Sequence, residues 1–211
     1  MTAILTLGPR EAKLHLILAH GAGAPMTSPF MEAMSLALAE DGVASTRFEF
    51  AYMAGRRNDG VKRPPPSMDI LTEEFRAVVA AHPCAPDQRL FIGGKSMGGR
   101  VASLIADDFH AAGAIAGLVC LGYPFHPPGK PEQLRTAHLA ALRCPTLIVQ
   151  GTRDPLGTEP QVATYPLSPA IALEWLEDAG HDFKPRKSSG HPQASHLATA
   201  ATAIARFVTL P

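Results

Sequence analysis

The sequence has no excess of charge of either sign. Its 211 residues include 19 Lys and Arg and 19 Asp and Glu, so the formal net charge at pH 7 is +0. Proteins that bind nucleic acid or anionic membranes through electrostatics usually carry a basic excess. The balanced charge gives no case for either partner, and we expect neither nucleic acid nor a membrane to bind.

Cysteine is scarce, and its three residues are far apart. Cys84, Cys120 and Cys144 form no CxxC pair and have no Cys/His spacing typical of zinc. We therefore expect reduced structural cysteines in a cytoplasmic protein that needs neither a metal nor a cofactor.

Long hydrophobic runs are also missing. The run "LHLILA" (14–19) is far too short to span a bilayer, and the first residues lack the basic region and apolar core of a secretory signal. With 46% hydrophobic and 18% charged residues, the chain has the composition of an ordinary globular protein. Its length predicts a single domain, 1–211, with a sizeable core.

Apolar runs alternate with helical patterns along the whole chain. Strands are expected at 14–21, 43–50, 89–94, 117–125, 145–151 and 171–178, with 2–8 as a candidate seventh. Helices are expected at 28–42, 68–82, 97–109, 130–143 and 193–208, and a long loop at 51–67. Continuous Val/Ile/Leu strands that each precede a helix predict an α/β fold. It is a three-layer α/β/α sandwich with a mostly parallel sheet of six to seven strands.

The stretch "FIGGKSMGGR" (91–100) lies between an expected strand and an expected helix, and two motifs compete for it. A phosphate-binding loop needs a glycine five residues before Gly94, so that a free loop can wrap the phosphates. Arg89 stands there instead, and residues 89–92 belong to the strand. A phosphate-binding loop is therefore not expected.

The second motif is Gly-x-Ser-x-Gly, which is typical of a nucleophile elbow. Such a turn holds its serine in a strained conformation and needs small residues two positions before and after it. Gly94 and Gly98 meet this need around Ser96, and Gly93 and Gly99 are expected to add slack. The helix that follows directs amide N–H groups at the place where an oxyanion forms.

A nucleophilic serine needs a base and an orienting acid, which in parallel sheets follow in the order Ser, Asp or Glu, His. Asp154 in "GTRDPLG" and His181 in "AGHDF" each follow an expected strand. The carboxyl ends of parallel strands share one edge, so we expect Ser96, Asp154 and His181 to converge there. The nearest competitors for the two partner roles are His191, His196, Asp178 and Asp182.

The segment "HGAGAP" (20–25) follows the first long strand, where a second oxyanion donor is expected. We assign the oxyanion hole to the amides of Met97 and Ala22, with Gly23 as the other candidate for the second donor. His20 is expected to pack and hydrogen-bond beneath this loop rather than to act as a second base.

Several basic residues lie near the expected site. Lys95 is next to the serine, and it either touches an anionic substrate or has a structural or solvent-facing role. Arg56 and Arg57 lie with Lys62 and Arg63 in the 51–67 segment. They either overhang the site and favour a substrate with a carboxylate or phosphate, or belong to a solvated loop stiffened by prolines.

In order along the chain, "HGAGA", "GGKSMGG", "GTRDPLG" and "AGHDF" resemble the landmarks of the α/β-hydrolase superfamily over nearly the whole length. More narrowly, "HGAGAPMTSPFM", the segment that begins "FEFAYM" and "GGKSMGGRVAS" resemble a subfamily of small dienelactone hydrolase-like proteins. That subfamily includes testis-expressed hydrolase-like proteins and a chromatin-complex subunit. Dienelactone hydrolases proper use a cysteine nucleophile, so Ser96 argues against their substrate.

The interval 126–144 is too short for the cap that many hydrolases of this fold carry, so a minimal, lidless domain is expected. Together these features predict a serine hydrolase of the carboxylesterase type, which cleaves an ester or related acyl bond of a small-molecule substrate. The alternatives are a non-catalytic hydrolase-like interaction module and an acyltransferase. The sequence indicates no particular oligomeric state.

Overall fold

The strands form one seven-stranded sheet. The computed structural model describes residues 2–85 and 87–210, and within them the strand order is β1-β3-β2-β4-β5-β6-β7. The strands are β1 (Ile4–Leu7), β2 (Leu14–Ala19), β3 (Ala44–Phe48), β4 (Arg89–Lys95), β5 (Gly117–Leu121), β6 (Thr146–Gly151) and β7 (Ile171–Leu176). Only β1 is antiparallel to its neighbour, β3. The expected mostly parallel sheet is confirmed, and the candidate strand in 2–8 is its edge strand β1.

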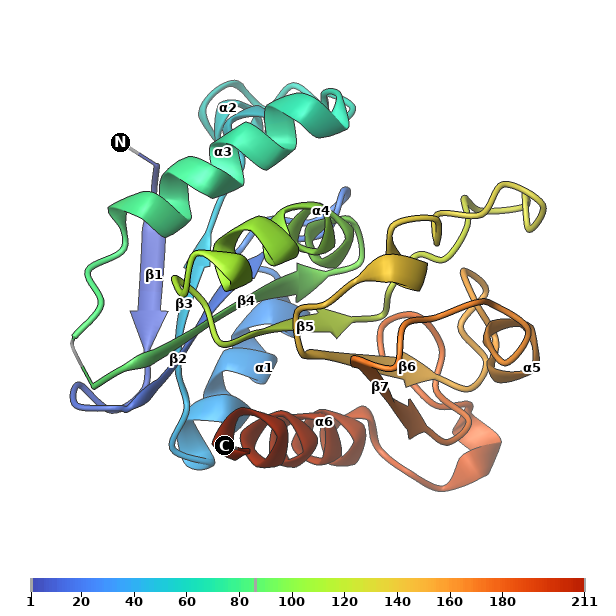
Figure 1. Cartoon of the computed structure of the whole chain (residues 1–211). Helices are drawn as coiled ribbons and strands as arrows, with labels where there is room; N and C mark the ends of the chain where they lie inside the picture. Colours follow the sequence, from blue (N-terminus) through green and yellow to red (C-terminus); the bar gives the residue numbers. More distant parts are fainter. Residues whose placement is uncertain (1, 86, 211) are drawn as a thin grey trace.

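Helices cover both faces of this sheet (Figure 1). On one face lie α1 (Pro29–Glu40) and α6 (Gln193–Thr209), and on the other lie α3 (Met68–Ala81) and α4 (Met97–Ala111). Two shorter helices, α2 (Ala51–Asp59) and α5 (Glu159–Val162), follow β3 and β6. The three-layer α/β/α sandwich is therefore as the sequence predicts.

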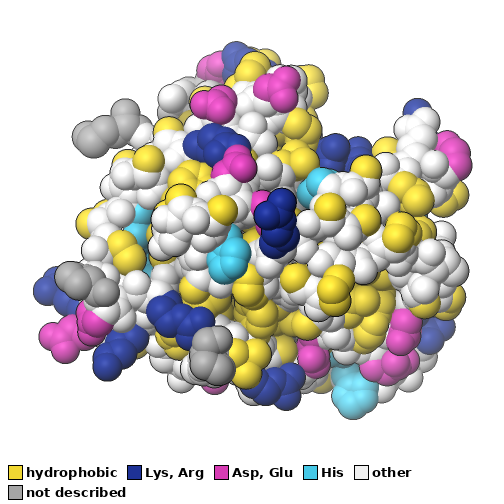
Figure 2. All heavy atoms as spheres, viewed as in Figure 1, with side chains coloured by type: hydrophobic (Ala, Val, Ile, Leu, Met, Phe, Trp, Pro, Cys, Tyr) yellow, Lys and Arg dark blue, Asp and Glu magenta, His cyan; other side chains and the backbone are white. Residues whose placement is uncertain are grey.

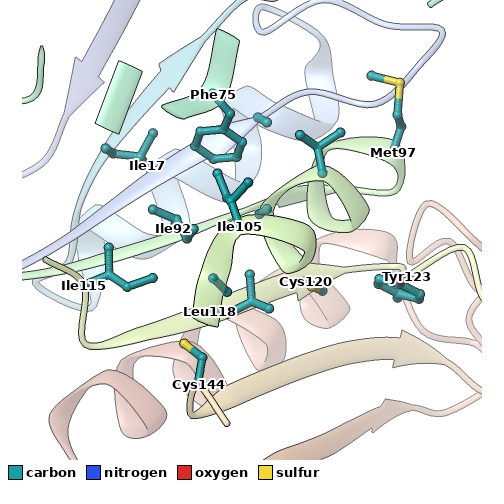
Figure 3. Close-up of a cluster of buried hydrophobic side chains, with 14 of the residues drawn as sticks. Ile17, Phe75, Ile92, Met97, Ile105, Ile115, Leu118, Cys120, Tyr123 and Cys144 are labelled. Atoms are coloured by element: carbon teal, nitrogen blue, oxygen red, sulfur yellow. The ribbon is translucent and has the colours of Figure 1, made fainter. Parts of the chain in front are cut away.

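The core lies in two layers because strand side chains alternate between the faces. Ile17, Ile92 and Leu118 point toward α3 and α4, where Figure 3 shows them around Phe75 and Ile105. Their sequence neighbours point to the opposite layer, against α1 and α6, among them Leu16, Leu18, Phe91 and Val119. Each central strand is thus buried on both faces, which explains why it reads as a continuous apolar run.

The expected loop 51–67 is wrong in its first half, which forms helix α2. Only Met53 of this helix is buried, so the apolar periodicity that normally reveals a helix is missing. The helix is stabilised at its ends instead. Its first amide, on Ala51, donates to the Glu74 carboxylate (2.8 Å), and Gly60 ends it in a left-handed conformation (φ 74°).

The expected helix 130–143 is also wrong, since only the 3₁₀ turn Leu139–Ala141 forms there. Apart from short turns, backbone groups of this segment bond to partners elsewhere in the fold. The Arg135 amide donates to the Phe125 carbonyl (2.8 Å), and the Tyr123 hydroxyl donates to the Arg135 carbonyl (3.0 Å). The Asp107 carboxylate accepts from the Arg143 amide (2.9 Å). The connection from β5 to β6 therefore carries no large cap, as the sequence predicts.

Charges of both signs are interspersed on the molecular face in Figure 2, in agreement with the balanced composition. In the part of the chain that the structure describes, no helix is both long and apolar enough to cross a membrane. Within the same residues, no group of three or more His, Cys, Asp or Glu side chains is arranged to hold a metal ion.

Candidate functional site

Ser96 occupies the sharp turn between β4 and α4, and its backbone is strained. Its φ of 52° is a left-handed value, which is uncommon for a residue with a side chain. A side chain at Gly94 or Gly98 would place its Cβ 2.5 Å from the Ala19 carbonyl oxygen. The flanking glycines are therefore required because the turn packs against the end of β2, as expected for a nucleophile elbow.

Gly93 and Gly99 were expected to add slack to the turn, but the structure gives a different reason for a glycine at each position. A Cβ at Gly93 would lie 2.0 Å from the Val119 carbonyl oxygen, and a Cβ at Gly99 would lie 2.8 Å from the Gly94 oxygen. Both positions are closely packed rather than loose. Four glycines together let the elbow lie against β2 on one side and β5 on the other.

The structure brings Ser96, His181 and Asp154 into one hydrogen-bonded chain. His181 Nε2 lies 2.9 Å from Ser96 Oγ, and His181 Nδ1 lies 2.7 Å from Asp154 Oδ2. An ionised carboxylate only accepts hydrogen bonds, so Asp154 selects the imidazole tautomer with its proton on Nδ1. Nε2 then faces Ser96 as an acceptor, which is the arrangement that a general base needs.

Asp154 is fully buried, and each of its oxygens has a donor. Oδ2 accepts from Gln150 Nε2 (3.0 Å) as well as from His181, and Oδ1 accepts from the Leu156 amide (2.8 Å). Gln150 is itself buried, and its amide also bonds to both backbone groups of Tyr123. Sequence reasoning missed Gln150 because it lies inside β6 and belongs to no motif; a polar residue within an apolar strand was the available signal.

The competing side chains have other partners. His196 is buried against the Phe183 carbonyl (3.2 Å), and His191 is exposed. Asp178 pairs with Arg186 and Arg153, and Asp182 pairs with Lys95. The structure therefore brings neither His191 nor His196 to Ser96, and neither Asp178 nor Asp182 to Nδ1 of His181.

Three backbone amides near Ser96 have no protein acceptor among the described residues. The Met97 amide is at the first turn of α4, and the Met97 side chain lies in the cluster of Figure 3. Ala22 and Gly23 line a cavity together with Ser96. Among the described residues, the amides of Met97, Ala22 and Gly23 donate no hydrogen bond to protein atoms. These amides are free to bind an anionic oxygen, and their place in an oxyanion hole stays a prediction.

His20 packs and hydrogen-bonds next to the loop 21–24, so this part of the prediction is confirmed. It is fully buried, its Nδ1 donates to the Gly21 carbonyl (2.7 Å), and its Nε2 accepts from the Phe50 amide (3.2 Å). Burial lowers its pKa from 6.5 to about 4, against the opposing effect of the Gly21 carbonyl. His20 is therefore neutral at pH 7, and both ring nitrogens serve the backbone.

Ser96 and His181 open onto a cavity of about 760 Å³. Its walls are apolar on the side of α1 and α6, where Phe30, Met31 and Leu197 lie, and they include Lys95 and Lys184. A second cavity, of about 580 Å³, lies beside Cys84 and Arg89 at the amino end of β4. That second cavity contains none of the three hydrogen-bonded side chains.

Lys95 is buried, so the expected solvent-facing role is wrong, whereas its contacts support the structural role that was given with it. Its Nζ lies 3.2 Å from Asp182 Oδ1 and 5.3 Å from the centre of the Phe30 ring. Burial lowers the pKa of Lys95, while the charges of Asp182 and Asp154 oppose the shift. The ion pair ties the loop that carries His181 to the end of β4. Contact of Lys95 with a substrate stays a prediction.

Arg56 and Arg57 belong to helix α2, and both contact the protein. Arg56 donates to the Gly23 carbonyl (3.3 Å), and Arg57 pairs with the buried Glu49 carboxylate (2.9 Å). Both line a small cavity of about 250 Å³ with Met53, and neither lines the cavity that contains Ser96. The suggested contact of these arginines with a substrate stays a prediction without support from this arrangement.

Solved structures with the same fold include three hydrolases. A dienelactone hydrolase from Anabaena variabilis has a TM-score of 0.71 and 20% identity, covering 97% of this chain and 89% of its own. An α/β serine hydrolase without a lid from Xanthomonas campestris has a TM-score of 0.67 and 18% identity, covering 100% and 96%. Est1E from Butyrivibrio proteoclasticus, solved with ferulic acid, has a TM-score of 0.69 and 16% identity, covering 98% and 93%.

At these identities the likeness establishes the fold alone. A family comparison goes further, because the model of the family described as "Alpha/beta hydrolase domain" matches residues 12–209. The match includes every residue placed at or near the site above, from Ala19 to Leu197. The chain therefore belongs to the alpha/beta hydrolase domain family.

Proposed function

We propose that the protein is a serine hydrolase of the carboxylesterase type, which cleaves an ester or related acyl bond of a small substrate. The observation that carries the proposal is the hydrogen-bonded chain from Ser96 through His181 to the buried Asp154, at 2.9 and 2.7 Å. The strained elbow supports it, because it presents the serine at the mouth of a cavity.

The chemistry has two stages. In the first, Ser96 Oγ attacks the carbonyl carbon while His181 Nε2 takes the hydroxyl proton, and the carbonyl electron pair moves onto oxygen. The amides of Met97 and of Ala22 or Gly23 bind this oxyanion, and each such donor contributes roughly 3–4 kcal/mol in the transition state. The intermediate then expels the alcohol, which takes the proton from His181.

The second stage releases the acid. Water gives a proton to His181 and attacks the carbonyl of the acyl-serine. The new tetrahedral intermediate then collapses, the carboxylic acid leaves, and Ser96 Oγ takes the proton back from His181. Asp154 stabilises the imidazolium in both stages. All of these steps are performed by residues of the chain and a water molecule, with the same base used twice.

The cavity supports a preference for small esters. It is open, since no cap covers it, and Phe30, Met31 and Leu197 offer apolar contacts to an acyl or alcohol group. An open cavity of this size holds a short group well but leaves a long chain in water. We therefore infer higher kcat/KM for esters of short acids than for those of long-chain fatty acids.

The decisive variant is Ser96→Ala, with Ser195→Ala on the exposed face of α6 as the matched control. Hydrolysis of short p-nitrophenyl esters should fall by at least about 10³-fold in Ser96→Ala, since the nucleophile is lost. Ser195→Ala should keep the activity of the wild type. Activity retained in folded Ser96→Ala would reject the proposal.

Two other functions remain to be separated from hydrolysis. A non-catalytic interaction module would leave Ser96 unlabelled by a fluorophosphonate probe, whereas a hydrolase is labelled there. An acyltransferase would pass the acyl group to an added alcohol in preference to water. Product analysis in the presence of glycerol measures that partition directly.

A further inference from the structure

Three consecutive carbonyl groups of the loop after β2 each accept a hydrogen bond from a side chain. The Gly21 oxygen accepts from His20 Nδ1 (2.7 Å), the Ala22 oxygen from the Tyr52 hydroxyl (2.9 Å) and the Gly23 oxygen from Arg56 (3.3 Å). Two of the three donors come from helix α2. All the carbonyls of this short stretch are therefore held by groups outside the loop.

Because the peptide bond is planar, holding a carbonyl group also fixes the direction of the next amide N–H. In a planar trans peptide the C=O of one residue and the N–H of the next point in opposite directions. A donor that holds the Ala22 carbonyl therefore directs the Gly23 N–H to the other side, and one that holds the Gly23 carbonyl directs the Ala24 N–H likewise. Ala22, Gly23 and Ala24 all line the cavity that contains Ser96.

Helix α2 is well anchored for such a task. Glu74 binds its first amide (2.8 Å), Met53 is buried, and Arg57 pairs with the buried Glu49 (2.9 Å). The Tyr52 ring lies 5.8 Å from that of His20. Burial raises the pKa of Tyr52, so its hydroxyl stays protonated and donates to the Ala22 carbonyl. Both donors thus project from a fixed helix.

We propose that Tyr52 and Arg56 are positioning residues, which hold the loop 21–24 so that its amides face the oxyanion formed at Ser96. The proposal rests on the proposed hydrolase function and assigns a task to helix α2 within it. Neither side chain touches the substrate. Their removal should weaken binding of the transition state while leaving binding of the ester unchanged.

This role differs from the recognition of substrate charge by Arg56, and matched esters separate the two. If Arg56 binds an anionic substrate, Arg56→Met lowers kcat/KM for an anionic ester and leaves that for a neutral ester of the same size unchanged. If it positions the loop, both esters lose activity equally, because both reactions pass through the same oxyanion.

The experiment compares Tyr52→Phe and Arg56→Met with two matched controls remote from the loop, Tyr165→Phe and Arg206→Met. No hydrogen bond from the Tyr165 hydroxyl is found among the described residues, and Arg206 pairs with Glu174 on the surface. Loss of a whole oxyanion donor lowers kcat about 10²–10³-fold, so misdirection of the Gly23 amide should cost roughly tenfold in Tyr52→Phe. Arg56→Met frees the next peptide of the loop, and its loss should be of the same size or smaller. KM and the melting temperature should stay near those of the controls.

A second measurement reads the loop itself without any turnover. Backbone order parameters of the amides of Ala22, Gly23 and Ala24, from ¹⁵N relaxation, should be high in the wild type and lower in Tyr52→Phe and Arg56→Met. Unchanged order parameters with unchanged kcat would overturn the proposal, as would a loss confined to anionic esters. If the wild type hydrolyses no ester, the proposed hydrolase function is rejected by that result. The order parameters still test separately whether α2 holds the loop 21–24.

Discussion

At the scale of single residues, the elbow depends on glycines that are defined by what lies beside them. The Gly-x-Ser-x-Gly pattern predicts small residues at 94 and 98. The structure shows that a larger side chain at either position would collide with the Ala19 carbonyl. Gln150 and Tyr52 show what the sequence does not reveal. Neither belongs to a motif, and each has its partner, Asp154 or the Ala22 carbonyl, only after the strands and α2 are assembled.

Gly98→Ala tests the close packing of the elbow. The new Cβ would lie 2.5 Å from the Ala19 oxygen and 2.7 Å from the His20 oxygen, so strands and helix must separate. We expect a loss of about 1–3 kcal/mol in the free energy of unfolding, measured with urea. Gly180→Ala is the control, since its nearest contact would be an ordinary 3.7 Å. Equal stability of the two variants would contradict this account of the turn.

At the scale of elements, the strands were predictable and two connections were not. The central strands are buried on both faces, so their continuous apolar runs indicate strands of a parallel sheet directly. These are β2, β4, β5 and β6. Helix α2 and the segment 130–143 depend instead on distant groups, such as Glu74 and Asp107, that bind their backbone amides. Local periodicity carries no information about such partners.

Gly60→Ala tests whether α2 serves the site as an element. Gly60 ends α2 at φ 74°, and Gly129 has φ 69° in the connection from β5 to β6; neither position crowds a Cβ. Each alanine should therefore cost about 1–2 kcal/mol in unfolding free energy through left-handed strain. Only Gly60→Ala should also lower kcat, because only it loosens the helix that holds the loop 21–24. A similar fall in kcat in Gly129→Ala would show that lost stability alone explains the effect.

At the scale of the whole molecule, the parallel sheet explains how distant segments form one site. β4, β6 and β7 end at Lys95, Gly151 and Leu176, and Ser96, Asp154 and His181 follow within a few residues. The shared carboxyl edge of parallel strands therefore predicts the convergence of the three side chains from the sequence. The cavity walls were not predictable in this way, because they come from α1 and α6, whose packing is a property of the assembled layers.

Two buried histidines make the stability of the molecule depend on pH. Burial lowers the pKa of both His15 and His20 from 6.5 to about 4, helped at His15 by the charge of His82. Between pH 6.5 and 4 the unfolded chain therefore binds protons that the folded chain does not. The stabilising contribution of these two histidines should be fully present above pH 6.5 and be lost as the pH falls toward 4. The free energy of unfolding should drop by up to about 1.4 kcal/mol per pH unit for each histidine.

Urea unfolding at pH 7.5, 6.0 and 5.0 measures this dependence. His15→Asn should reduce the slope, because one of the histidines whose pKa is lowered by burial no longer titrates. A free energy of unfolding that stays constant over this range in the wild type would show that the two histidines are not held neutral by the fold.

The central claim, that Ser96 is acylated during turnover, is tested most directly by trapping the acyl-enzyme. The wild type is mixed with a short p-nitrophenyl ester and quenched in acid within the first turnovers, and its peptides are then analysed by mass spectrometry. We predict a mass increase equal to the acyl group on the peptide that contains Ser96, and none in Ser96→Ala. Turnover with the acyl group on another residue, or with the same modification in Ser96→Ala, would contradict the account.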